Sequence, residues 1–148
     1  MRCALTVKPS GKWDRRAALD RVVLDAEDRH CRRVSLTTEG GISFLLNLPR
    51  ATFLRDGDGL LLDDGAIIAV AGKPEPLVEI SAPSARDLAR LAWHIGNRHT
   101  DLQVIGETLR IRRDPVLEDM LAALGARLEA VDAVFEPEQG AYAHHHDD

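Results

Sequence analysis

Five of the six histidines lie in two short segments of the chain. The first segment is WHIGNRHT, Trp93–Thr100, and it contains His94 and His99. The second segment, close to the C-terminus, contains His144, His145 and His146. Neutral imidazole is a good ligand for nickel, copper and zinc, and histidine-rich tracts often bind metal. Both segments are therefore candidate metal sites.

A metal ion needs more than the single imidazole of His99. In a two-fold homodimer the same residue of both subunits can meet at the axis, so His99 would supply two ligands. The three tail histidines would add ligands from a flexible tether, at high effective concentration. Two simpler interpretations stay open: a lone surface histidine often binds nothing, and the HHH tract could be a cloning remnant.

Other residues that could do chemistry form no recognisable catalytic set. The chain has no nucleophile elbow, no P-loop and no HExxH motif, so we expect no enzymatic activity. The DGDG stretch at residues 56–59 fails the calcium-loop pattern, because Leu60 stands where an oxygen ligand is needed. His30 and Cys31 are adjacent and could bind a metal, but neighbours on a strand point to opposite faces.

The composition describes a folded and slightly acidic chain. Hydrophobic residues make up 45%, which is enough for a core, and the net charge of -5 argues against a nucleic-acid binder. The basic clusters at residues 29–33 and 110–113 are interpreted as solvated strand faces. The two cysteines have no CxxC spacing. Since no secretion signal and no long apolar run is found, we expect a cytoplasmic protein without membrane contact.

The first half consists of short apolar or alternating runs separated by turn formers, which predicts a β-rich domain over residues 1–73. Asp64-Gly65 is the clearest hairpin signal among these turns. The GKPEP stretch, Gly72–Pro76, contains two prolines and a glycine. It predicts a break in any strand and a domain boundary.

Two amphipathic helices are predicted in the second half. The first has Ser84 as its N-cap and Gly96-Asn97 as its stop, because both of these residues tolerate left-handed geometry. The second is capped by Asp114, and Gly125 ends it. Early carboxylates of this helix, Glu118 and Asp119, favour its dipole.

Strands are predicted before, between and after these helices, in the order β-α-β-β-α-β. The predicted fold class is therefore α+β, with a ferredoxin-like domain over residues 74–136 after the β-rich domain. Residues 137–148 are polar and lack periodicity, which predicts a flexible histidine-containing tail.

Three stretches carry a resemblance to a known family: WHIGNRHTDLQV, residues 48–77 (LPRATFLRDGDGLLLDDGAIIAVAGKPEPL), and DPVLEDMLAALGARLEAVDAVFEPEQGAY. Together they cover nearly all of the chain from Leu48 on, and the combination of GNRH with FEPE and GAY is specific. The chain resembles the urease accessory protein UreE family of nickel metallochaperones.

The resemblance implies a peptide-binding-like first domain and a metal-binding second domain through which a homodimer forms. It implies that His99, the histidine of GNRH, is the interface nickel ligand, and that the tail histidines add ligands. It also implies transfer of nickel (Ni2+) to apo-urease, together with the accessory GTPase UreG and other urease accessory proteins. Zinc or copper should bind in place of nickel.

The chain departs from some relatives just before the second helix, where they carry extra histidines. Here the stretch reads RIRRDPV, so Arg112, Arg113 and Pro115 cannot bind metal, and one shared site per dimer is expected. Two other functions stay open. One is an assembly factor of urease maturation that does not use metal. The other is an RNA-binding module, which the absence of aromatic residues in LQVIGETLRIRR disfavours.

Overall fold

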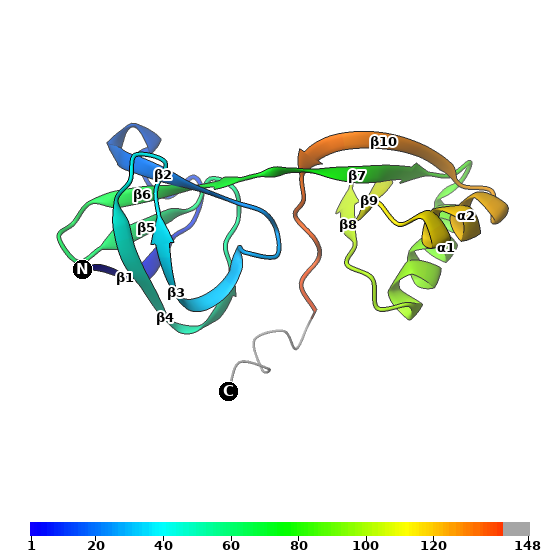
Figure 1. Ribbon diagram of the computed structural model, residues 1–148. Coiled ribbons are helices and arrows are strands. Elements are labelled where there is room, and N and C mark those ends of the chain that lie inside the picture. Colours follow the sequence, from blue (N-terminus) through cyan, green and yellow to red (C-terminus); the bar gives the residue numbers. More distant parts are fainter. Residues whose placement is uncertain (141–148) are drawn as a thin grey trace. The chain divides into compact units, whose positions relative to one another are not determined.

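The computed structural model describes residues 1–140 and divides the chain into two compact units. The first unit runs from Met1 to Lys73 and takes in Gln139 and Gly140. The second runs from Pro74 to Glu138 (Figure 1). Among the described residues, no helix is both long and apolar enough to cross a membrane.

The described part of the first unit is built on a six-stranded sheet. Its elements are β1 Arg2–Lys8, a short 3-10 helix η1 Arg15–Ala17, β2 Ala18–Leu24, β3 His30–Thr37, β4 Ser43–Phe53, β5 Gly59–Leu62 and β6 Ile67–Gly72. The strand order is β2-β6-β5-β1-β4-β3, with β1 parallel to β4 and β2 parallel to β6. The prediction of a β-rich first half is confirmed.

The turns of this unit are fixed by carboxylates. Asp64-Gly65 forms the predicted β5–β6 hairpin turn, with Gly65 at φ +90°. Asp58 of the DGDG stretch is buried, and its carboxylate accepts hydrogen bonds from the Ser10 N–H at 3.0 Å and the Arg55 N–H at 2.9 Å. Asp58 of the DGDG stretch therefore links its own loop to the loop of Ser10, which lies 48 positions earlier in the sequence.

The second unit is a four-stranded antiparallel sheet with two helices. Its elements are β7 Pro74–Ser81, α1 Ala85–Asn97, β8 Gln103–Ile105, β9 Thr108–Arg112, α2 Pro115–Ala123 and β10 Arg127–Val134. The strand order β10-β7-β9-β8 is the ferredoxin-like arrangement, which confirms the predicted fold class. Both helices pack on one face of the sheet, where the buried residues are Val78, Ile80, Leu91, Ile95, Leu109, Ile111, Leu117 and Leu121.

The prediction that GKPEP breaks any strand was wrong, since β7 begins at Pro74. Pro76 pairs with Asp132 of β10, and its carbonyl accepts the Arg113 N–H on the opposite side. The N and C=O of one strand residue point the same way, so the hydrogen that proline lacks would point away from β10. Since β9 pairs with β7 only from Leu77 onward, the missing hydrogen falls just beyond the paired part of β9.

Candidate metal site

His99 lies immediately after α1, in a helix-ending motif that fixes its backbone. The His99 N–H donates to the Gly96 carbonyl at 3.0 Å, and the Thr100 N–H donates to the Ile95 carbonyl at 3.4 Å. These two bonds define a Schellman motif, which places His99 at the position that takes left-handed geometry. Its φ is +58°, the one positive value among the described residues other than glycine.

The sequence placed this left-handed stop at Gly96-Asn97, and the structure corrects it. Both residues belong to α1, and neither has a positive φ. A left-handed conformation costs a residue with a Cβ about 1–2 kcal/mol, although histidine tolerates it better than most. An observed outlier of this kind is a reason to look for function at the residue.

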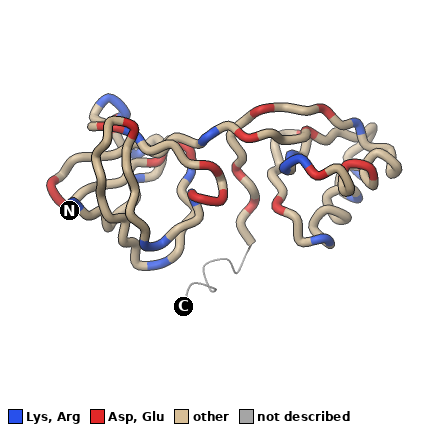
Figure 2. The backbone as a smooth tube through the Cα atoms, viewed as in Figure 1, with Lys and Arg blue, Asp and Glu red and all other residues tan. Residues whose placement is uncertain are grey.

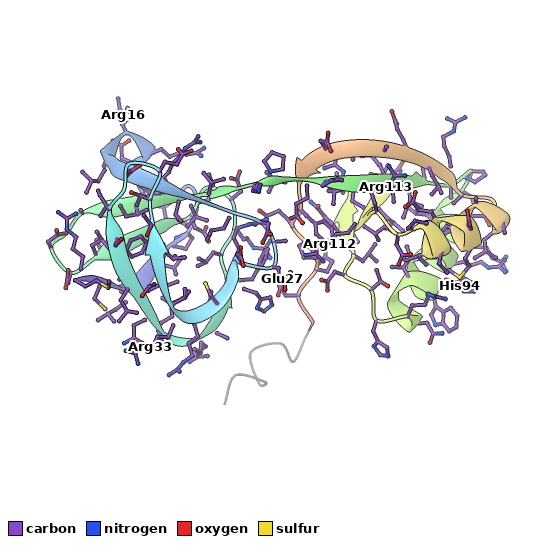
Figure 3. All side chains as sticks on the ribbon, viewed as in Figure 1. Arg16, Glu27, Arg33, His94, Arg112 and Arg113 are labelled. Carbon is purple, nitrogen blue, oxygen red and sulfur yellow. The ribbon has the colours of Figure 1, made fainter. Side chains whose placement is uncertain are left out.

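The imidazole of His99 is exposed. Within residues 1–140 it takes part in no side-chain hydrogen bond or ion pair. Trp93, in the last two turns of α1, is 63% exposed, an unusual state for an indole. His94 of α1 (Figure 3) is half-buried, and its ring makes an edge contact with the Trp93 ring at 5.1 Å between centroids. The C-terminal end of α1 is therefore followed by an exposed imidazole close in sequence to an exposed aromatic ring.

Arg112 of β9 anchors the segment that follows His99. Its guanidinium donates to Asp101 at 3.0 Å and to Glu75 of β7 at 3.3 Å, and it lies 4.9 Å from the centre of the Phe135 ring. Asp101 is two residues beyond His99. Arg112 thus ties the α1–β8 connection to the sheet, a positioning role that local sequence signals did not reveal.

The basic cluster at residues 110–113 is not the free solvated face expected from the sequence. Arg110 pairs with Glu79 at 3.0 Å, and both side chains are largely buried. Arg113 pairs with Glu118 of α2 at 3.0 Å. The guanidinium of Arg113 and the Asp114 N–H lower the pKa of Glu118. Each of these arginines is therefore matched by a carboxylate (Figure 2 shows both charges along the second unit).

The chain after β10 returns to the segment that carries His99. Phe135 and Pro137 are buried, the Glu136 N–H donates to the Gln103 side chain at 3.0 Å, and the Glu138 N–H donates to the Leu102 carbonyl at 2.7 Å. Glu138, at the start of the expected tail, is thus hydrogen-bonded to Leu102, which follows His99 by three residues in the sequence. His144, His145 and His146 lie outside the described residues.

His30 and Cys31 stand in different environments at the start of β3. His30 is exposed, whereas Cys31 is half-buried against the core of the first unit. Burial, aided by the charge of Asp28, raises the pKa of the Cys31 thiol to about 11. Since metals bind the thiolate, Cys31 is a poor ligand at neutral pH.

The described residues do not complete a metal site within one chain. In residues 1–140, no three His, Cys, Asp or Glu side chains gather closely enough to hold an ion. His99 would therefore need ligands from the tail or from a second copy of the chain. The imidazole is exposed and has no side-chain partner among residues 1–140, which leaves it open to both sources.

Both halves of the chain match models of one protein family. Residues 5–72 match the N-terminal domain of the UreE urease accessory protein, and residues 75–148 match its C-terminal domain. The urease accessory protein UreE of Rhodopseudomonas palustris (strain HaA2) is 52% identical over 135 residues, covering 91% of this chain and 62% of its own length. That of Beijerinckia indica is 49% identical, covering 97% and 85%.

The chain thus spans less than two thirds of the first of these relatives. A third relative, from Chelativorans sp. (strain BNC1), is 48% identical over 93% of this chain and 87% of its own length. Family models cover almost the whole chain, and the ferredoxin-like second unit carries the GNRH histidine at the end of its first helix. The chain belongs to the UreE urease accessory protein family.

Proposed function

We propose that this protein is a nickel-binding metallochaperone that delivers Ni2+ for assembly of the urease active site. The observation that carries the proposal is the state of His99, an exposed imidazole held in a left-handed backbone conformation without a side-chain partner among the described residues. A fold that needed only a helix end would place glycine there. We therefore infer that position 99 is a histidine because of its imidazole, and not because the helix end requires it.

The proposed site is shared by two chains. The described residues of one chain offer no cluster of three metal ligands, so further ligands are needed. A two-fold axis close to His99 would bring the imidazoles of both subunits to one ion. The exposed Trp93 supports an interface at this end of α1, because covering an indole removes a large apolar surface from water. We therefore propose a homodimer that forms through the second unit.

His144, His145 and His146 are proposed as additional ligands. Glu138 is bonded to Leu102, and His144 follows Glu138 by six residues. An extended chain of that length spans at most ~21 Å, which is enough to return to the end of α1. A tethered imidazole acts at high effective concentration and can leave the metal one ligand at a time.

Stepwise exchange is what a carrier needs. An exposed site of imidazoles binds nickel but can pass it to a partner, here proposed to be the accessory GTPase UreG and apo-urease with its other accessory proteins in the cytoplasm. Zinc and copper should bind too, because imidazole ligands do not select nickel. Protons compete for the same ring nitrogens, so binding should weaken in acid.

A nickel titration by calorimetry tests the proposal, with the wild type, His99→Gly and His94→Ala. Glycine suits the left-handed position, so His99→Gly removes the ligand without disturbing the helix end. We expect about one ion per dimer in the wild type and in His94→Ala, and loss of that ion in His99→Gly. Unchanged binding in His99→Gly would reject the shared site, and metal binding by the tail or an assembly role would become the better interpretation.

A further inference from the structure

The proposed function leaves the first basic cluster, residues 29–33, without a role. Arg29 belongs to the fold, because its side chain is fully buried and donates to two backbone carbonyls at 3.2 and 3.3 Å. Arg32 and Arg33 of β3 are both exposed. Neighbouring residues of a regular strand point to opposite faces, so two consecutive exposed arginines require a local irregularity.

A β-bulge provides that irregularity. Cys31 and Val34 are three positions apart, and in a regular strand they would face opposite sides of the sheet. Both nevertheless pack against the core of the first unit, and the register of β3 with β4 shifts between Cys31 and Arg33. Bulges of this kind change the direction of side chains. Here the bulge leaves Arg32 and Arg33 together on the outer face.

The same irregularity brings a third arginine to this place from β4. The register shift leaves Arg32 alone opposite residues 48–51. Arg50 lies in that stretch and is exposed. Figure 2 shows basic segments of β3 and β4 next to each other in the first unit, and Arg33 is labelled in Figure 3. We call these three residues the arginine patch: Arg32, Arg33 and Arg50.

The arginine patch is not neutralised by the described part of its own chain. Within residues 1–140, the three side chains take part in no hydrogen bond and no ion pair. In the second basic cluster, by contrast, Arg110, Arg112 and Arg113 are each matched by a carboxylate. Three unpaired arginines reverse the charge locally in a chain whose net charge is -5. Such a patch attracts an anionic partner.

A protein segment rich in carboxylates is the anion that fits the arginine patch best. Guanidinium groups bind carboxylates in a bidentate manner, and arginine is enriched among the residues that dominate protein interfaces. Nucleic acid fits less well, because its affinity depends on neutralising many phosphates. The exposed residues Glu27 and Asp28, on the turn before β3, would repel a phosphate backbone that continued past the patch.

The position of β3 offers a simpler interpretation. It is the last strand of the six-stranded sheet, and charges on an edge strand prevent unwanted pairing with other sheets. A single arginine on β3 would meet that need. It would not require a bulge that turns a second arginine to the same face, nor Arg50 on β4, which lies between β1 and β3.

We propose that the arginine patch is a docking site through which the first unit binds a carboxylate-rich segment of a protein partner. This role goes beyond the proposed metal site and does not depend on it, because the patch belongs to the first unit and His99 to the second.

The experiment uses the full chain and a fluorescein-labelled octaglutamate peptide, whose binding is measured by fluorescence anisotropy at low salt. The patch variant carries Arg32→Gln, Arg33→Gln and Arg50→Gln. The matched control removes the same charge from exposed and unpaired arginines of the second unit, with Arg86→Gln, Arg90→Gln and Arg127→Gln. We expect at least ~5-fold weaker binding in the patch variant and a change of at most ~2-fold in the control.

NMR gives a second readout that depends on position. Unlabelled octaglutamate should shift the backbone amides of Arg33 and Arg50 and leave those of Arg86 and Arg90 in place. Urea unfolding should show equal stability of the patch variant and the wild type, since only exposed side chains change.

Three results would overturn the proposal. Octaglutamate could bind the patch variant as well as the wild type, or the control could lose as much affinity, and the arginines would then only protect the edge of the sheet. A single-stranded RNA of equal charge could bind the patch more tightly than the peptide, which would indicate a nucleic-acid site. Failure of the proposed function would be seen separately, in the nickel titration of His99→Gly, which leaves the arginine patch unchanged.

Discussion

The two helices of the second unit end in the same way with different residues. At the end of α2 the Gly125 N–H donates to Ala122 and the Ala126 N–H to Leu121, each at 3.0 Å, with Gly125 at φ +92°. At the end of α1 the equivalent left-handed residue is His99. Glycine gives the more stable left-handed helix end, so α1 ends with a less stable backbone conformation than α2. Of the two helices, α1 is the one whose end carries the candidate ligand.

The largest expected effect comes from making the two ends alike. His99→Gly should abolish nickel binding at the proposed shared site while raising the free energy of unfolding by up to ~1 kcal/mol, because the left-handed strain is relieved. Calorimetry and urea unfolding measure the two quantities. If the variant were less stable than the wild type, the His99 side chain would stabilise the fold in a way that glycine at this position does not.

The reverse exchange tests the strain itself. Gly125→His should lower the free energy of unfolding by about 1–2 kcal/mol, and it should leave nickel binding at His99 unchanged. An added Cβ at Gly125 would meet no atom within 4 Å, so the cost should come from the backbone and not from a clash. An equal loss of stability in Gly125→Asn, which tolerates left-handed geometry, would contradict this explanation.

A third variant asks whether the end of α1 needs its anchor. Arg112→Met should weaken nickel binding several-fold and lower the free energy of unfolding by about 1 kcal/mol, since it removes two partly exposed ion pairs and the contact with Phe135. Arg113→Met is the matched control, because Arg113 pairs with Glu118 of α2. Equal nickel affinities in the two variants would show that Arg112 does not position the segment that follows His99.

The smallest effect concerns the other ends of the helices. The Ser84 hydroxyl caps α1, whereas α2 is capped by Asp114 and by Glu118, whose carboxylate binds Arg113 and the Asp114 N–H. A lowered folded-state pKa means that Glu118 stabilises the protein above its unfolded pKa, and that this contribution disappears as pH falls through the folded value.

Glu118→Gln should therefore cost at most ~0.5 kcal/mol at pH 7 and less at pH 3 than at pH 7. Urea unfolding of both proteins at the two pH values measures the difference. Because α1 is capped by a neutral hydroxyl, Ser84→Ala should cost the same at both pH values and serves as the control. A Glu118→Gln penalty that persists at pH 3 would show that shape, and not charge, is responsible.

Local signals made much of the second unit predictable. Ser84, Asp114 and Gly125 act as the caps and stop that the sequence indicated, and the order of helices and strands is the one predicted. Each of these features depends on a few neighbouring residues. Strand breaks at Pro74 and Pro76 were wrongly expected, because sheet pairing decides which N–H groups are needed.

Only part of the candidate site could be predicted from local signals in the sequence. His99 was identified from its type and from a resemblance, but its left-handed backbone was assigned to Gly96-Asn97. Arg112 was dismissed as a residue that cannot bind metal, and its anchoring of Asp101 depends on contacts that span 11 and 37 residues of sequence. A two-fold partner and the tail ligands remain predictions, since they depend on a second chain and on residues beyond 140.

The left-handed backbone at position 99 limits what mutation can do there without unfolding the protein. Asparagine and aspartate, each one nucleotide away from histidine in the genetic code, keep the helix end intact, and glycine improves it. Random libraries sorted only for expression or solubility should therefore lose the imidazole at this position without any loss of stability. If the proposed metal site is right, histidine is kept at position 99 by a screen that rewards metal binding.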